Sequence, residues 1–188
     1  MLNLPNCLTL VRILTIPIFL EFLAYQFYGQ ALAVFILGGF TDFLDGLIAR
    51  KMKQQTALGA YLDPVADKLL VITSFVMLGA IGGIPMWLAV VVIVRDILII
   101  IGYAIIYVLV EEPLQVKPSR LGKWSTMLQL VTVGVALALL YDPTVFSAPF
   151  LDSFVWATTV TTVVSGCQYL YRGLLWLQNR AASINRPG

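Results

Sequence analysis

The sequence predicts an all-α, polytopic membrane protein in which six transmembrane helices form a single domain over residues 1–188. Hydrophobic residues make up 60% of the chain and charged residues 12%, whereas soluble domains contain roughly 45–50% and about 25%. Mean hydropathy is +0.90, and the apolar residues fall into runs near the ~20 residues that a bilayer requires. This composition excludes a soluble enzyme, a disordered chain and a nucleic-acid-binding domain.

Turn-forming and polar connections separate six apolar runs along the chain. The first run contains Arg12 and Glu21 and lacks a small-x-small cleavage site, so we expect a retained helix and not a cleaved signal peptide. A turn signal over residues 82–85, with two glycines and a proline, separates the third run from the fourth. The predicted spans are residues 8–27, 31–50, 58–81, 86–110, 124–141 and 154–177.

The distribution of Lys and Arg predicts the orientation of these spans. Connections 28–30, 81–85 and 142–152 contain no basic residue, whereas the other connections and the C-terminal tail are basic. Lys68 and Arg95 lie inside spans. The positive-inside rule therefore places both termini on the cytoplasmic side of the cell inner membrane. The basic residues expected on that side are Arg12, Arg50, Lys51, Lys53, Lys117, Arg120, Lys123, Arg172, Arg180 and Arg186.

Carboxylates are the main candidates for chemistry, because the chain has no His and its two Cys lie far apart. Four aspartates lie in the second and third spans, where each ionised carboxylate costs about 2.5 kcal/mol or more on insertion scales. Asp42 and Asp45 are three residues apart, and Asp63 and Asp67 are four apart, so each pair shares one helix face. The second span runs toward the cytoplasm and the third begins there, which predicts a similar depth for all four.

Neighbouring carboxylates repel one another unless a cation lies between them. Without His or thiolate ligands, the expected cation is Mg²⁺ or Mn²⁺. Gly46 and Gly59 each fall one turn from an aspartate and leave room for a bulky ligand. Arg50 follows near the cytoplasmic mouth and can hold a phosphate. This pattern predicts a diphosphate substrate, with Asp67 or a neighbour as general base for an attacking hydroxyl.

Other readings of the acidic cluster are a structural pairing of an aspartate with Lys68 or Arg95, a transport site in a divalent-cation transporter, and a non-catalytic membrane scaffold. Ion transport needs no room for a nucleotide, and a scaffold needs no four charges at one depth. The glycines and Arg50 therefore favour a transferase over both.

The spacing D-x2-D-G-x2-A-R-x8-G-x3-D-x3-D resembles the signature of the CDP-alcohol phosphotransferases, which are integral membrane enzymes. The matching residues are Asp42, Asp45, Gly46, Ala49, Arg50, Gly59, Asp63 and Asp67. The resemblance implies the six-helix fold of that family, a homodimer, and two Mg²⁺ or Mn²⁺ ions bound by the four aspartates. It implies a CDP-linked donor with CMP as leaving group, and Asp67 as the group that activates the acceptor hydroxyl. The expected contacts to CDP include Asp45, Gly46, Arg50 and Gly59.

The N-terminal segment over residues 3–12 is similar to that of bacterial phosphatidylglycerophosphate synthases and cardiolipin synthases of this family. The similarity implies that Pro5, Asn6 and Thr9 approach the nucleotide. Pro5 can begin a helix, and Asn6 and Thr9 then share a face about one turn apart. A polar helix start at the membrane surface is the alternative reading of these three residues.

A phosphate-bearing acceptor needs cationic groups near the metal ions. Arg95 in the fourth span is the first candidate, and the start of the fifth span adds Lys117, Arg120 and Lys123. The stretch from Gly122 to Gln129 also resembles the G-K-x-x-T-x-x-Q pattern of those synthases. Plain positive-inside topology explains Lys123 equally well.

The resemblance implies CDP-diacylglycerol as donor and sn-glycerol 3-phosphate as the expected acceptor. Synthases that use glycerol phosphate often carry Arg-Glu in the fourth span, with a second Arg about two turns later. Here Arg95 is followed by Asp96 and then by apolar residues 97–103. This departure leaves a cardiolipin synthase that uses phosphatidylglycerol as the alternative.

Overall fold

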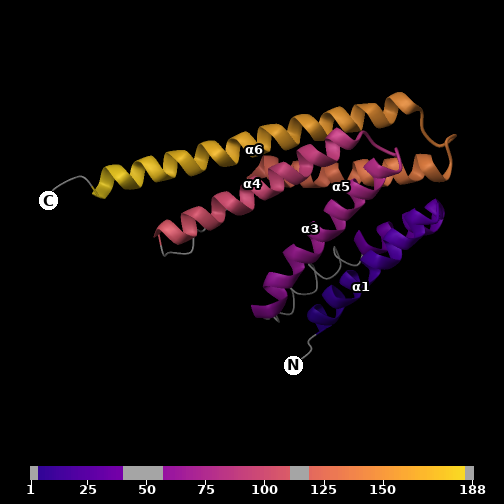
Figure 1. The fold of residues 1–188 in the computed structure, drawn as a ribbon, viewed down its shortest axis with the longest axis horizontal. Helices are drawn as coiled ribbons and strands as arrows, with labels where there is room; N and C mark the ends of the chain where they lie inside the picture. The colour runs from indigo at the N-terminus through magenta and orange to yellow at the C-terminus, as the bar shows by residue number, and fades with distance from the viewer. Residues whose placement is uncertain (1–3, 40–56, 111–118, 185–188) are drawn as a thin grey trace.

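A computed structural model describes residues 4–39, 57–110 and 119–184 of the chain. All regular structure in these ranges is helical, which confirms the all-α prediction (Figure 1). The helices are α1 (Leu4–Ala24), an unlabelled helix over Tyr28–Gly39, α3 (Ala57–Ala80), α4 (Met86–Val110), α5 (Arg120–Tyr141) and α6 (Ala148–Ile184).

The turn between α3 and α4 forms where the glycines predicted it. Gly82 has φ of 78°, a left-handed conformation that glycine adopts without steric cost. The backbone N–H of Gly83 donates to the carbonyl of Leu78 at 2.8 Å and satisfies an end carbonyl of α3. Pro85 then precedes the first residue of α4, so the predicted and observed bounds of the fourth helix agree.

Helices α5 and α6 are longer than the apolar runs that predicted them. Helix α5 begins at Arg120 because Ser119 caps it: the Ser119 side chain accepts a hydrogen bond from the backbone N–H of Gly122 at 2.9 Å. Helix α6 extends from Ala148 to Ile184, beyond the expected 154–177 at both ends. Hydropathy marks the apolar stretch of a helix, whereas backbone hydrogen bonds continue into polar sequence.

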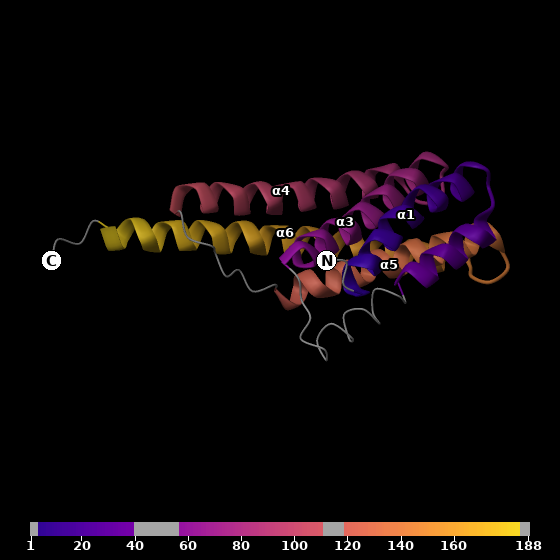
Figure 2. The same cartoon turned by 90° about the horizontal axis from the view of Figure 1, so that it is seen from below.

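The helices pack in a connected series. Helix α1 packs on α3, α3 packs on α4 and α5, and α4 and α5 both pack on α6. Phe19, Phe75, Leu88 and Val133 belong to one buried cluster that joins four of these helices. The short connections after α1, α3 and α5 lie at the same end of the bundle in both views (Figures 1 and 2).

The described residues show polar groups inside and large apolar groups outside. Helix α4 exposes a run of hydrophobic side chains that includes Val90, Val94 and Ile101, while Arg95 and Asp96 on the same helix are buried. Such an arrangement suits a lipid environment and not water. By length and composition, one described helix, α5, is apolar enough to cross a membrane.

Candidate active site

The aspartate motif is partly placed by the structure. Asp63 and Asp67 lie one turn apart on one face of α3, and Gly59 lies one turn before Asp63. Asp42, Asp45, Gly46 and Arg50 fall outside the described residues, as do the side chains of Asp63 and Asp67. The gathering of four carboxylates therefore remains a prediction.

Helix α3 has α1 as its neighbour. Asn6 and Thr9 lie in the first two turns of α1, and α1 and α3 run side by side in the same direction (Figures 1 and 2). The N-terminal segment and the first turns of α3 are thus at the same end of the bundle. This position is compatible with the expected nucleotide contacts, although the side chains of Asn6 and Thr9 lie outside the described set.

The donor chemistry on α3 fits a hard divalent cation. Two aspartates one helical turn apart offer oxygen ligands from a single rigid element. Within the described part of the chain, no group of three or more His, Cys, Asp or Glu residues gathers to hold a metal. Asp63 and Asp67 are the two expected ligands that lie on a described helix.

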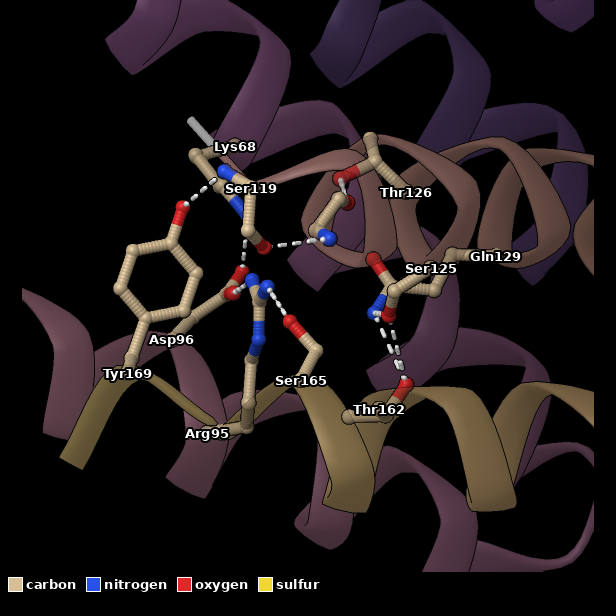
Figure 3. A network of polar contacts seen from close by, with 11 residues as sticks. Lys68, Arg95, Asp96, Ser119, Ser125, Thr126, Gln129, Thr162, Ser165 and Tyr169 are labelled. Atoms are coloured by element: carbon tan, nitrogen blue, oxygen red, sulfur yellow. Dashed lines mark hydrogen bonds and ion pairs between the residues drawn. The ribbon is translucent and has the colours of Figure 1, made fainter. Parts of the chain in front are cut away.

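Arg95 lies in a polar cluster between α4 and α6. Its guanidinium donates from Nη1 to Oδ1 of Asp96 at 2.7 Å and from Nη2 to the hydroxyl of Ser165 at 2.6 Å (Figure 3). The guanidinium carbon also lies 5.7 Å from the ring centroid of Tyr169. The buried Nε atom has no hydrogen-bond partner among the described residues. Arg95 is therefore held in place through both terminal nitrogens, while its Nε–H has no partner among the described residues.

Lys68 joins this cluster from α3. Its Nζ atom lies 2.6 Å from Oδ2 of Asp96, so each carboxylate oxygen of Asp96 serves one cation. Two positive side chains and one negative side chain leave a net positive charge. Because Lys68 directly follows Asp67, the cluster lies next to the turn of α3 that carries the expected metal ligands.

The start of α5 is tied to α6 beside this cluster. The hydroxyl of Tyr169 accepts a hydrogen bond from the backbone N–H of Ser119 at 3.3 Å. A Cβ atom on Gly122 would lie 3.3 Å from that hydroxyl and 3.2 Å from the Ser119 hydroxyl. Glycine at position 122 thus allows α5 to approach Tyr169 closely.

The other expected acceptor residues are less enclosed. Arg120 and Lys123 lie in the first turn of α5 and are exposed. Neither forms a salt bridge with a residue whose side chain the structure describes. Lys117 lies outside the described residues. Their role as acceptor contacts remains a prediction.

Gln129, the last residue of the G-K-x-x-T-x-x-Q stretch, is buried between α5 and α6. Its Nε2 atom donates to Thr162 at 3.2 Å and to Ser125 at 3.4 Å, whereas its Oε1 atom has no partner among the described residues. Thr126 instead donates to the backbone carbonyl of Gly122 at 3.2 Å. The pattern thus contributes to helix packing in the described structure.

Sequence reasoning did not assign Lys68, Ser165 or Tyr169 to the site. The position of Lys68 inside an apolar span indicates a buried partner, because a lysine there is costly without one. Ser165 and Tyr169 lie among many hydroxyl and aromatic side chains of α6, and nothing in their spacing distinguishes them. Their proximity to Arg95 depends on how α6 packs against α4.

Comparison with known proteins provides independent information. The family model described as CDP-alcohol phosphatidyltransferase matches residues 2–164. A Bacillus subtilis protein named CDP-diacylglycerol–glycerol-3-phosphate 3-phosphatidyltransferase is 34% identical over 184 residues, covering 90% of this chain and 94% of the relative. A Pseudomonas fluorescens protein of the same name is 45% identical over 104 residues, covering 52% of this chain and 53% of the relative.

A human protein named cardiolipin synthase (CMP-forming) is also similar. It is 33% identical over 191 residues, which covers 91% of this chain and 62% of the relative. The relatives of this chain thus include proteins named as a CDP-diacylglycerol–glycerol-3-phosphate 3-phosphatidyltransferase and as a cardiolipin synthase.

Proposed function

This chain belongs to the CDP-alcohol phosphatidyltransferase family, and on this premise we propose that it transfers the phosphatidyl group of CDP-diacylglycerol to sn-glycerol 3-phosphate. The products are phosphatidylglycerophosphate and CMP. The observation that carries the proposal is the similarity to the Bacillus subtilis relative along nearly the whole of both chains. The complete eight-residue motif supports it, because a divalent-cation transporter or a scaffold has no need of those glycines and Arg50.

The four motif aspartates, Asp42, Asp45, Asp63 and Asp67, are the residues that would hold two Mg²⁺ or Mn²⁺ ions. When bound, such ions supply Lewis-acid stabilisation of phosphate charge. The carboxylate of Asp67 accepts the proton of the acceptor hydroxyl as that oxygen attacks the β-phosphate of the donor. Arg50 binds phosphate oxygens through its guanidinium, while Gly46 and Gly59 leave space for the nucleotide.

The acceptor phosphate is proposed to bind at Arg95. Its side chain is 8% exposed, and its Nε–H has no partner among the described residues. Guanidinium N–H groups make strong, directional hydrogen bonds to phosphate. The net positive charge of Lys68, Arg95 and Asp96 attracts an anion to this position. Arg120 and Lys123 at the exposed start of α5 extend the positive region toward water.

The chain is a membrane protein, since it belongs to a membrane-bound family and carries a strongly apolar exterior. We propose that all six helices cross the inner membrane with both termini in the cytoplasm, where the basic connections lie. The acyl chains of the donor then remain in lipid, and the CDP group enters from the cytoplasmic side. A homodimer is the proposed assembly.

The test uses purified protein in detergent with CDP-diacylglycerol and four acceptors in parallel: glycerol 3-phosphate, phosphatidylglycerol, serine and inositol phosphate. We expect CMP release with glycerol 3-phosphate, only in the presence of Mg²⁺ or Mn²⁺, and phosphatidylglycerophosphate as the lipid product. EDTA should abolish turnover reversibly. A cardiolipin product from phosphatidylglycerol alone would instead establish the second candidate function, which the human relative supports.

Asp67→Asn tests the general base. Loss of an acid–base group typically lowers the rate about 10²–10⁴-fold, and a ligand role for Asp67 would deepen the loss. Asp152→Asn is the matched control, because Asp152 is exposed near the opposite end of the bundle. Full turnover by a folded Asp67→Asn protein would remove Asp67 from this role.

A further inference from the structure

The carboxylate of Asp96 connects three helices. Its Oδ2 atom contacts Nζ of Lys68 on α3 at 2.6 Å, and its Oδ1 atom contacts Nη1 of Arg95 on α4 at 2.7 Å. Arg95 in turn donates to Ser165 on α6 (Figure 3). The side chains of Asp96 and Arg95 are 2% and 8% exposed, so their contact is shielded from solvent, whereas the Lys68 side chain is 36% exposed.

Asp96 reduces the repulsion between Lys68 and Arg95. Two cations held close together repel one another unless an anion lies between them. Among the residues whose side chains the structure describes, Asp96 is the carboxylate that meets both Lys68 and Arg95. Asp96 therefore keeps the two cations together while the cluster as a whole stays positive.

The position of Lys68 connects this ion pair to the proposed chemistry. Lys68 follows Asp67 and lies about one turn beyond Asp63 on α3. Because a helix is rigid over so short a length, a tether at Lys68 fixes the rotation and depth of the turns before it. A small error in the placement of reacting groups is costly in an enzyme.

We propose that Asp96 is a positioning residue: through Lys68 it holds the metal-binding face of α3 in place, and through Arg95 it aims a guanidinium at the acceptor phosphate. This inference rests on the proposed function. Ser165 completes the arrangement, since its hydroxyl holds the other end of the same guanidinium. A purely structural ion pair would affect folding and leave both kinds of ligand binding unchanged.

The two connections can be broken separately. Lys68→Met removes the link to α3 and leaves the contacts of Arg95 with Asp96 and Ser165. Ser165→Ala removes the hydrogen bond from Arg95 to α6. It leaves the contact of Arg95 with the Tyr169 ring and leaves Lys68 on Asp96. The matched control is Thr158→Ala. Thr158 also carries a fully buried hydroxyl on α6, two turns from Ser165, and this hydroxyl pairs with Thr132 and not with Arg95.

The first measurement is Mn²⁺ binding to the purified protein without substrates, followed by electron paramagnetic resonance of free Mn²⁺. Lys68→Met should weaken Mn²⁺ binding about tenfold, the lower end of what loss of an outer-shell partner costs. Lys68→Arg, which retains the ion pair with Asp96, should restore binding. Ser165→Ala and Thr158→Ala should bind Mn²⁺ as the unaltered protein does.

The second measurement separates the Michaelis constants of the two substrates. Ser165→Ala should raise the KM for glycerol 3-phosphate several-fold and leave the KM for CDP-diacylglycerol unchanged. Asp96→Asn should show both defects, and Asp96→Glu should recover part of each. If Asp96→Asn fails to fold, the two single-link variants still decide the question.

The outcomes separate this inference from the proposed function. Unchanged Mn²⁺ affinity in folded Lys68→Met, together with an unchanged acceptor KM in Ser165→Ala, would overturn the positioning role while the parent enzyme remains active. A parent protein that releases no CMP would overturn the proposed function, and the Mn²⁺ titration of Lys68→Met would still test the tether. A parent protein that binds no Mn²⁺ would overturn both.

Discussion

The hydroxyl oxygens of Thr132 and Thr158 lie 2.7 Å apart at the interface of α5 and α6, and both side chains are fully buried. Ser125 and Thr162 form a similar contact at 3.1 Å, two turns away along α5 and about one turn away along α6. A lipid environment offers these hydroxyls no partner, so they join helices whose outer surfaces are apolar. Hydrogen bonds of this kind, and not hydrophobic burial alone, specify which faces of α5 and α6 meet.

Thr158→Val should destabilise the protein only slightly, by about 0.5–1 kcal/mol. The loss is small because Thr132 retains a second acceptor, the carbonyl of Leu128 at 2.8 Å, and valine preserves the shape of threonine. Unfolding in mixed detergent micelles measures this difference. A decrease in the free energy of unfolding several times larger would contradict the view that this pair only joins two helices.

Gly166→Ala should displace Arg95. An added Cβ atom at position 166 would lie 3.3 Å from Cγ of Arg95, which is closer than an ordinary contact. Because Arg95 is the proposed acceptor contact, we expect the KM for glycerol 3-phosphate to rise several-fold with little change for the donor. Gly102→Ala is the control, since a Cβ atom there meets no atom within 4 Å. Equal effects of the two substitutions would contradict the assignment of Arg95.

Ser119→Ala should loosen the first turn of α5. The substitution removes the side-chain acceptor of the Gly122 N–H, and loss of such a cap typically costs about 1 kcal/mol. Faster hydrogen exchange confined to the first turn of α5 is the expected signature. Ser119→Asp keeps a capping oxygen and should exchange more slowly than the alanine variant, and uniform exchange across all three proteins would exclude capping by Ser119.

Asp142 should titrate below its ordinary value. The Thr144 hydroxyl at 2.7 Å and the Thr144 backbone N–H at 2.9 Å both donate to Oδ1, and these hydrogen bonds lower the pKa of Asp142 beneath 3.8. A lowered folded-state pKa contributes stability above the unfolded-state value, and that stability disappears as the pH falls through the folded-state pKa.

The measurement for Asp142 is a carboxyl-detected NMR titration. Thr144→Ala removes the hydroxyl donor, so the pKa of Asp142 should move up toward 3.8. The rate of CMP formation should not change. Asp142 caps the C-terminus of α5, and the connection from α5 to α6 lies at the end of the bundle away from the first turns of α3 (Figure 1). An unaltered titration in Thr144→Ala would show that the hydroxyl does not act on Asp142.

Much of the helical layout could be predicted from sequence because apolar runs and turn residues are local signals. The fourth helix begins and ends where its apolar run does, since Pro85 and the preceding glycines define its start. The apolar run predicts a start of α5 four residues too late, because Ser119 caps the helix through one hydrogen bond that hydropathy does not detect. The apolar run also predicts too short an α6, because the helix continues into polar sequence at its C-terminal end.

The sequence alone determined the family motif, since the spacing of the aspartates and glycines is a property of the chain and survives without coordinates. It also placed Lys68 and Arg95 inside apolar spans and offered each as a structural partner for an aspartate. Only the tertiary structure decided that Asp96 serves both, that Ser165 holds Arg95 from α6, and that Tyr169 meets Ser119. Helices that are apolar on most sides carry little periodic information about their rotation, so the faces that meet are set by packing between distant segments.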